Sequence, residues 1–217
     1  MVLNQGSKRL LGVYLQALLG YSDSPWVQEI IKDKESGRVL AESTPLPDNT
    51  LYPKEKELLR ICTEAKRDNR KTVVYCVHTE TRDITERLKK ILGDAGLQAE
   101  VLKASKVKAG EREEWIQSFR GDVLITHPRN VQTGLDLIQF PEVVWYQQDY
   151  SVYIVRQASR RSWRIGQKEP VNVHHLYYKS TIQEKAITLD VKKLRAALLT
   201  EGELTDRQFL EQLEEDG

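Results

Sequence analysis

Arginines dominate the segment in which residue types and spacing point most clearly to chemistry. Residues 156–167 read Arg-Gln-Ala-Ser-Arg-Arg-Ser-Trp-Arg-Ile-Gly-Gln and contain no acidic residue. On a helix, Arg156, Arg160 and Arg164 would repeat every fourth position, and such like-charged pairs each destabilise a helix by roughly a few tenths of a kcal/mol. Guanidinium groups bind phosphate oxygens through a planar fork of donors. The pattern indicates an anion site, for a nucleotide or a nucleic-acid backbone, and is equally consistent with arginines that pair with acids elsewhere.

A second polar segment follows a short apolar run. Residues 126–137 read Thr-His-Pro-Arg-Asn-Val-Gln-Thr-Gly-Leu-Asp-Leu. Gly134 would let a ligand approach the backbone closely. Asp136 lies between two leucines, where an unpaired carboxylate is costly. On its own, this Thr-Gly-Leu-Asp sequence is at least as consistent with a helix cap.

The surrounding elements must position these segments. Short, continuous, β-branched apolar runs are typical of strands buried on both faces, and their alternation with helices predicts a parallel sheet. We therefore expect an α/β fold in three layers, with helices on both faces of the sheet. Function in such sheets lies in the loops after the strands, here after Val77, Thr126 and Tyr146. Strands are expected at 72–77, 98–102, 123–126, 143–146 and 171–178, and helices at 8–19, 54–66, 79–92, 110–119, 153–163 and 181–199.

Composition divides the chain into three parts. Residues 1–50 are punctuated by prolines and are interpreted as an N-terminal extension or inter-lobe segment, 51–200 carry the α/β pattern, and 201–217 form an acidic tail. The net charge of +1 does not mark a nucleic-acid binder, so any basic surface must be local. No apolar run is long enough for a membrane span, and Cys62 and Cys76 suit a reducing compartment. We expect a cytoplasmic protein with no membrane partner and no metal site.

The two polar segments, in this order and with this separation, resemble the last two helicase motifs of superfamily-2 enzymes of the Swi/Snf-type branch. That DEAD/DEAH-like family has a Thr…Gly-Leu-Asn/Asp-Leu segment, a strand, and then a Gln-Ala-x-x-Arg-x-x-Arg-Ile-Gly-Gln helix. The resemblance covers about residues 52–190. It implies a RecA-like fold of the P-loop NTPase type and the C-terminal motor lobe of an ATP-dependent helicase or translocase. Arg160 stands where the family usually has Gly, which suggests a divergent bacterial form.

The resemblance also implies roles at the nucleotide. Arg161 and Arg164 would be arginine fingers on the γ-phosphate of ATP, and therefore the catalytic residues of this lobe. Gln157 lies on the same expected helix and would face the nucleotide. Gly134 and Asp136 would complete the nucleotide side, with Asp136 as a ribose or finger partner.

Nucleic-acid contacts are implied for a second set of residues. These are His78, Thr126, Arg129 and Thr133, which would contact the backbone without reading sequence. The implied partners are double-stranded DNA and an N-terminal RecA-like lobe of the same polypeptide.

Two family features do not occur in these 217 residues. There is no Gly-x-x-x-x-Gly-Lys-Ser/Thr phosphate loop and no Asp-Glu-x-His/Asp box. These features supply the phosphate cradle and the Mg²⁺ carboxylate. We therefore expect ATP with Mg²⁺ to be bound mainly by the N-terminal lobe, and this chain alone to be inactive. The alternative is a non-catalytic RecA-like module that binds nucleic acid or protein, although the combination of Gln157, Arg161 and Arg164 argues against it.

Overall fold

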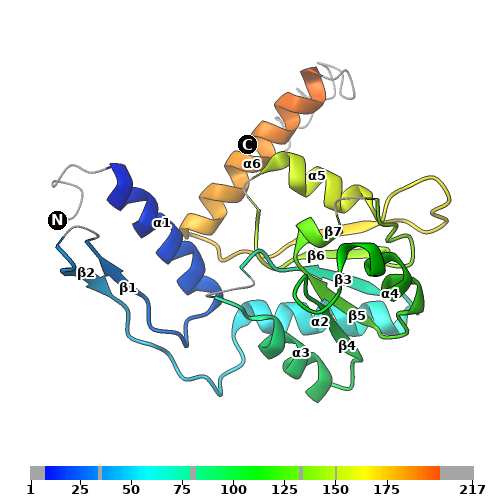
Figure 1. Ribbon diagram of the computed structural model, residues 1–217, viewed down its shortest axis with the longest axis horizontal. Helices are drawn as coiled ribbons and strands as arrows, with labels where there is room; N and C mark the ends of the chain where they lie inside the picture. The colour runs from blue at the N-terminus through cyan, green and yellow to red at the C-terminus, as the bar shows by residue number, and fades with distance from the viewer. Residues whose placement is uncertain (1–7, 34–35, 79–81, 132–133, 150, 201–217) are drawn as a thin grey trace.

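A parallel sheet of five strands forms the centre of the molecule (Figure 1). The structure is a computed structural model that describes residues 8–33, 36–78, 82–131, 134–149 and 151–200. The strand order is β4-β5-β3-β6-β7, so the chain crosses over between strands that are not consecutive. The strands are β3 (Thr72–Tyr75), β4 (Ala99–Leu102), β5 (Val123–Thr126), β6 (Glu142–Trp145) and β7 (Asn172–His175).

Helices cover both faces of the sheet, which confirms the expected three-layer α/β architecture. β3, β5 and β6 are buried along their whole length, as their continuous apolar sequences require. On one face, Leu58 and Leu88 pack from α2 (Pro53–Arg67) and α3 (Thr85–Asp94). On the other face, Ile116 and Ala158 pack from α4 (Arg112–Ser118) and α5 (Val152–Arg160). None of the helices in these described ranges is long and apolar enough to cross a membrane.

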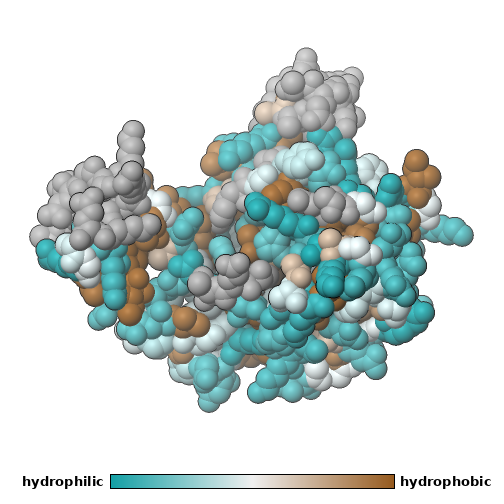
Figure 2. All heavy atoms as spheres, viewed as in Figure 1, coloured by the Kyte–Doolittle hydropathy of each residue, from teal (hydrophilic) through white to brown (hydrophobic). Residues whose placement is uncertain are grey.

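The N-terminal part is more regular than its prolines suggest. α1 (Lys8–Asp23) extends four residues past the expected helix, and β1 (Ile30–Lys32) pairs antiparallel with β2 (Val39–Glu42) where we expected irregular chain. In the turn between the strands, Gly37 has φ +68, a conformation that favours glycine. Both strands are too short for a clear alternating pattern, so the sequence did not reveal the hairpin. Figure 2 shows hydrophobic atoms on the surface of this region. Leu11, Tyr14 and Leu18 of α1 are exposed.

One buried ammonium group joins this N-terminal part to the sheet. Lys54 Nζ donates to Asp23 Oδ1 at 2.7 Å and to the carbonyl oxygen of Tyr146 at 2.6 Å. Asp23 Oδ1 also accepts from Gln183 Nε2 at 3.0 Å. Lys54 and Asp23 are only 4% and 5% exposed, so both charges have lost most of their hydration. The ends of α1 and β6 and the starts of α2 and α6 (Ile182–Thr200) therefore meet at one ion pair.

Arginines fix the turn and the hairpin that follow α1. Arg82 forms a bidentate ion pair with Glu29, just before β1. The Arg87 guanidinium lies 3.9 Å from the ring centroid of Trp26 and pairs with the fully buried Glu55. The segment that we interpreted as an extension therefore packs against α2 and α3.

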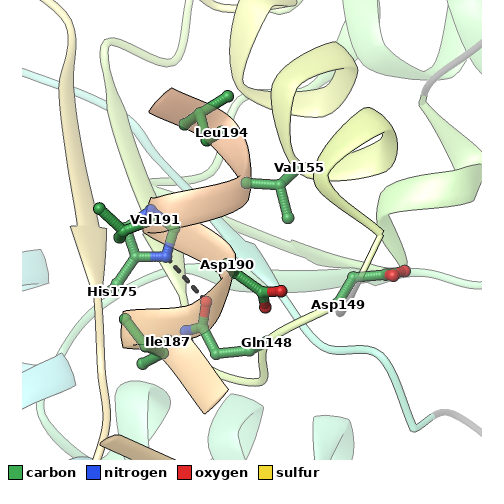
Figure 3. Close-up of a pocket in the computed structure, with 8 residues that line it drawn as sticks. All are labelled: Gln148, Asp149, Val155, His175, Ile187, Asp190, Val191 and Leu194. Carbon is green, nitrogen blue, oxygen red and sulfur yellow. Dashed lines mark hydrogen bonds between the residues drawn. The ribbon is translucent and has the colours of Figure 1, made fainter. Parts of the chain in front are cut away.

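A small cavity of about 50 Å³ separates α5 from α6 (Figure 3). Its walls are mostly apolar, and Asp190 projects into it from α6. Asp190 Oδ1 is buried without a hydrogen-bond partner and lies 3.6 Å from Lys193 Nζ. Burial raises the pKa of Asp190, and the pairing with Lys193 only partly opposes this. The charged form of Asp190 therefore destabilises the folded state.

Replacing Lys54 should test the buried ion pair. We expect Lys54→Ala to lower the free energy of unfolding by about 3 kcal/mol, because the Asp23 carboxylate stays buried without its cation. Arg60→Ala is the matched control on the same helix, since Arg60 pairs with Glu57 and Glu64 at the surface. It should lower the same free energy by less than about 1 kcal/mol. Equal losses in urea unfolding would contradict the account.

Asp190→Asn should stabilise the protein at neutral pH. The pKa of Asp190 is raised in the folded state, so the stability tied to this group is highest below the unfolded value of about 4 and falls as pH rises through the folded pKa. We expect a gain of about 1 kcal/mol at pH 7 that shrinks as the pH is lowered. Thermal unfolding of both proteins between neutral and acidic pH measures the difference. A gain that stays constant with pH would contradict a titrating cause.

Candidate functional site

The arginine-rich segment starts as a helix and leaves it earlier than expected. α5 ends at Arg160 rather than at Trp163. Just past this point, the carbonyl oxygen of Arg161 accepts a hydrogen bond from Leu137 N at 3.0 Å. In a longer helix that oxygen would accept from an amide of the helix itself. Like charges four residues apart also disfavour a longer helix. Residues 161–167, called the arginine loop below, consequently do not continue the helical face.

The arginine loop is bonded to the second polar segment. Arg164 Nη1 donates to Asp136 Oδ1 in a close ion pair. Gln167 Nε2 donates to the carbonyl oxygens of Ile138, at 2.8 Å, and Ser162, at 2.9 Å. The side chains of Arg164 and Asp136 are 49% and 55% exposed, so solvent screens their attraction. The pair can therefore open at small cost when another anion approaches Arg164.

Other predicted nucleotide residues lie close to this pair in the chain. Gln157 and Arg161 are half-buried at the end of α5. Burial raises the pKa of Tyr75, and the nearby charge of Arg161 opposes that shift, so the guanidinium lies within electrostatic reach of the sheet. Gly134 has φ +77 with open space around it, as a close ligand approach requires. Thr133 lies outside the described residues.

The arginine loop lies toward the amino ends of the strands. It leads directly into β7, and the segment with Asp136 leads into β6. Asn172 N and the carbonyl oxygen of Pro141 bond at 2.9 Å where those two strands begin. The arginine loop therefore does not lie with the loops that follow the carboxyl ends of the strands. After β6, the chain runs back along α5 toward the amino ends of the strands, and the arginine loop follows there.

Two large apolar side chains stand exposed on the arginine loop. Trp163 is 67% exposed and Ile165 is fully exposed. They lie with Arg160 and Arg164 around an open recess, and Figure 2 shows hydrophobic atoms projecting at the right of the molecule. Exposed apolar groups beside charged ones are typical of a surface that another protein or domain covers. Trp163 is therefore not a core residue, whereas Trp145 is fully buried.

His78 and Arg129 lie together at the opposite edge of the sheet. Both line a groove of about 340 Å³ between α1 and the loops that follow β3 and β5, called the carboxyl-edge groove below. Arg129 is exposed and His78 is half-buried. Burial, followed by the charge of Arg82, lowers the pKa of His78, so its imidazole is neutral at pH 7. Among the described residues that line the groove, Arg129 carries a positive charge and His78 offers a neutral imidazole.

Thr126 does not face this groove, contrary to our expectation of a nucleic-acid contact. Its side chain is fully buried, and Oγ1 donates to the carbonyl oxygen of Leu102 at 3.0 Å. The amide of Asn130 donates to Thr126 Oγ1 at 3.4 Å and to Leu102 O at 3.3 Å. A threonine at the last position of a central strand is enclosed by its neighbours. Its hydroxyl therefore fixes the loop that carries Arg129.

Two amides contribute to these sites in ways that the sequence analysis missed. Gln167 holds the arginine loop against the segment of Asp136, as described above. Gln147 Oε1 accepts from Val77 N at 3.0 Å and from His78 N at 2.9 Å, which fixes the loop after β3 and occupies both backbone amides. The Gly-Gln that ends the family motif was a signal for Gln167, but no local pattern marked Gln147.

Known proteins resemble this chain over the same region. A family model described as helicase conserved C-terminal domain matches residues 53–166. The human SWI/SNF-related matrix-associated actin-dependent regulator of chromatin subfamily A member 1 is 31% identical over 105 residues, which is 45% of this chain and 10% of that protein. A putative ATP-dependent helicase/translocase of Bacillus subtilis is 27% identical over 136 residues, which is 61% of this chain and 14% of that protein.

A solved structure shows the same fold. The crystal structure of the C-terminal part of the Fun30 ATPase domain superposes with a TM-score of 0.58 at 22% identity, covering 67% of this chain and 47% of that one. The chain spans a fifth or less of the length of the curated relatives quoted above. The family match includes more than half of the chain and ends within the arginine loop. The chain thus belongs to the helicase conserved C-terminal domain family, as the RecA-like C-terminal lobe of a superfamily-2 helicase of the Snf2 type.

Proposed function

We propose that this lobe supplies arginine fingers and part of the nucleic-acid track to an ATP-dependent DNA translocase. The observation that carries the proposal is the ion pair between Arg164 and Asp136, which joins the two family motifs at an exposed loop. The N-terminal lobe of the same motor is the proposed partner. Relatives named as ATP-dependent helicases and a helicase/translocase support the choice of this activity.

Arg164 has the surroundings that a finger needs. Before ATP arrives, Asp136 holds the guanidinium in a half-exposed position, where exchanging one anion for another is inexpensive. The γ-phosphate carries more charge than a carboxylate and accepts the same planar fork of donors. Such a guanidinium stabilises the charge that develops on the transferred phosphoryl group. Asp136 then serves as a positioning residue for Arg164.

The residues of this lobe suit the phosphate oxygens of ATP but not its Mg²⁺ ion. Arg161, Arg164 and Gly134 suit phosphate oxygens, since they offer charged donors and open backbone. The carboxylate beside them, Asp136, is paired with Arg164. The Mg²⁺ ligands and the phosphate cradle would therefore come from the N-terminal lobe. The exposed Trp163 and Ile165 suit that lobe as the surface on which it closes.

The nucleic-acid part of the proposal concerns the other edge of the sheet. Arg129 provides a phosphate contact that is independent of sequence, and His78 provides a neutral donor beside it. Such contacts suit movement along duplex DNA, because they position a backbone without reading bases. The fingers and the track then lie at opposite ends of the strands.

Arg164→Ala tests the finger in a polypeptide that contains this lobe and its N-terminal lobe. We expect the kcat of duplex-stimulated ATP hydrolysis to fall by about 10³-fold, because the phosphoryl charge loses its stabilising cation. The KM for ATP should change little. Arg160→Ala, in the same arginine-rich segment, is the matched control and should keep most of the rate. Hydrolysis that is insensitive to Arg164→Ala would favour a non-catalytic binding module.

The isolated 217-residue chain should hydrolyse no ATP. This result is expected because its sequence contains neither the phosphate loop nor the Asp-Glu box. Phosphate release with and without duplex DNA provides the measurement. A duplex-stimulated rate that Arg164→Ala removes would disprove the division of labour between the two lobes.

A further inference from the structure

The carboxyl-edge groove has two walls, and the family motifs account for only one. The loops after β3 and β5 contribute His78 and Arg129 to the first wall. The second wall is α1, through Leu15, Gln16 and Leu19. α1 lies before the region that matches the helicase family model, which starts at residue 53. Nothing in the family pattern therefore explains why this helix lines the groove.

Specific contacts hold α1 in this position. Gln183 Nε2 donates to the carbonyl oxygen of Leu19 at 3.3 Å, and Asp23 at the end of the helix joins the buried ion pair. Gly20 is buried, and a Cβ there would lie 2.6 Å from Cδ of Arg82. Because Gly20 has no side chain, α1 packs closely against Arg82, in the chain that follows β3. The groove is bounded by a fixed wall.

The charges around the groove favour an anionic occupant. Within the described residues, Arg129 has no carboxylate within ion-pair distance. Sequence positions 8–22 of α1 contain no acidic residue, and the one acid of the helix, Asp23, is neutralised by Lys54. Asp149 also lines the groove, but it is 9% exposed and its Oδ1 accepts from Ser151 N at 2.9 Å. Among the described residues that line the groove, the accessible polar groups are the Arg129 guanidinium, the His78 imidazole and the amides of Gln16 and Gln148, beside apolar carbon.

We propose that α1 is the second wall of the nucleic-acid track, so that a sugar–phosphate backbone lies between α1 and the loops after β3 and β5. Arg129 contacts a phosphate from one side, and the exposed amide of Gln16 faces the same backbone from the other. Leu15 and Leu19 pack against the sugars. This inference rests on the proposed nucleic-acid role of His78 and Arg129, and it extends the track to a segment outside the helicase motifs.

Charge swaps on α1 test the second wall in the full 217-residue chain. Gln16→Lys and Gln16→Glu place opposite charges in the groove, and Tyr14→Lys and Tyr14→Glu place them at a position that is exposed but does not line it. The Kd for a fluorescent duplex DNA is measured by anisotropy over a range of salt concentrations. At each position the Glu and Lys variants are compared with each other, so the loss of the native side chain cancels. Thermal unfolding confirms that all four variants are folded.

We expect the Glu variant at position 16 to bind on the order of tenfold more weakly than the Lys variant, because a phosphate lies within reach of both. Gln16→Lys should also steepen the dependence of log Kd on log salt by about 1, as one added phosphate contact does. The two Tyr14 variants should differ by less than about threefold, since screening weakens the field of a charge on another face.

Four results would overturn the proposal. Equal Glu-to-Lys ratios at positions 14 and 16 would mean that the backbone does not pass along the groove side of α1. Equal weakening by both Gln16 variants would indicate a steric effect without a phosphate nearby. If the wild-type chain does not bind duplex DNA at low salt, the proposed nucleic-acid track is wrong as a whole. The proposed arginine finger would still be tested separately by the ATPase measurement on Arg164→Ala. Loss of binding in Arg129→Ala, with no effect at position 16, would keep the proposed function and reject only the second wall.

Discussion

The Lys54 ammonium group is the point on which the arrangement of the lobe depends. It neutralises Asp23 at the end of α1 and caps the carbonyl oxygen at the carboxyl end of β6, with Gln183 of α6 completing the shell around the carboxylate. A buried pair of this kind contributes little net stability compared with apolar packing, but it tolerates few alternative geometries. Its effect is to fix where the N-terminal helix and the closing helix stand relative to the sheet. The carboxyl-edge groove exists because α1 is fixed there.

Both candidate sites touch the same stretch of chain. It leaves β5 at the carboxyl edge, where it carries Arg129, and it crosses the sheet to the arginine loop, where it carries Asp136. Between these ends, Val131 is fully buried and Leu135 is nearly so, both in the core on this face of the sheet. If ATP draws Arg164 away from Asp136, the change begins on a segment whose other end lies in the proposed track.

The local sequence predicted the layers of this fold correctly. It did not predict where α5 ends, that the Thr126 side chain is buried, or where α1 packs. Continuous apolar runs predicted the buried strands β3, β5 and β6. The end of α5 was not predictable, because the carbonyl oxygen of Arg161 is taken by Leu137, which lies in another motif. Thr126 was placed at the nucleic acid because the family resemblance implied that role, but its side chain is fully buried. The position of α1 depends on bonds between residues as far apart as Asp23 and Gln183, which no periodicity encodes.

The most direct test of the account compares two ligands of the two-lobe polypeptide. ADP resembles the ground state, whereas ADP with aluminium fluoride and Mg²⁺ imitates the phosphoryl group in transit, where a finger acts most strongly. The account predicts that Arg164→Ala weakens binding of the transition-state analogue by at least about 100-fold and leaves the Kd of ADP nearly unchanged. Equal loss for both ligands, or no loss for either, would contradict the claim that this lobe supplies an arginine finger.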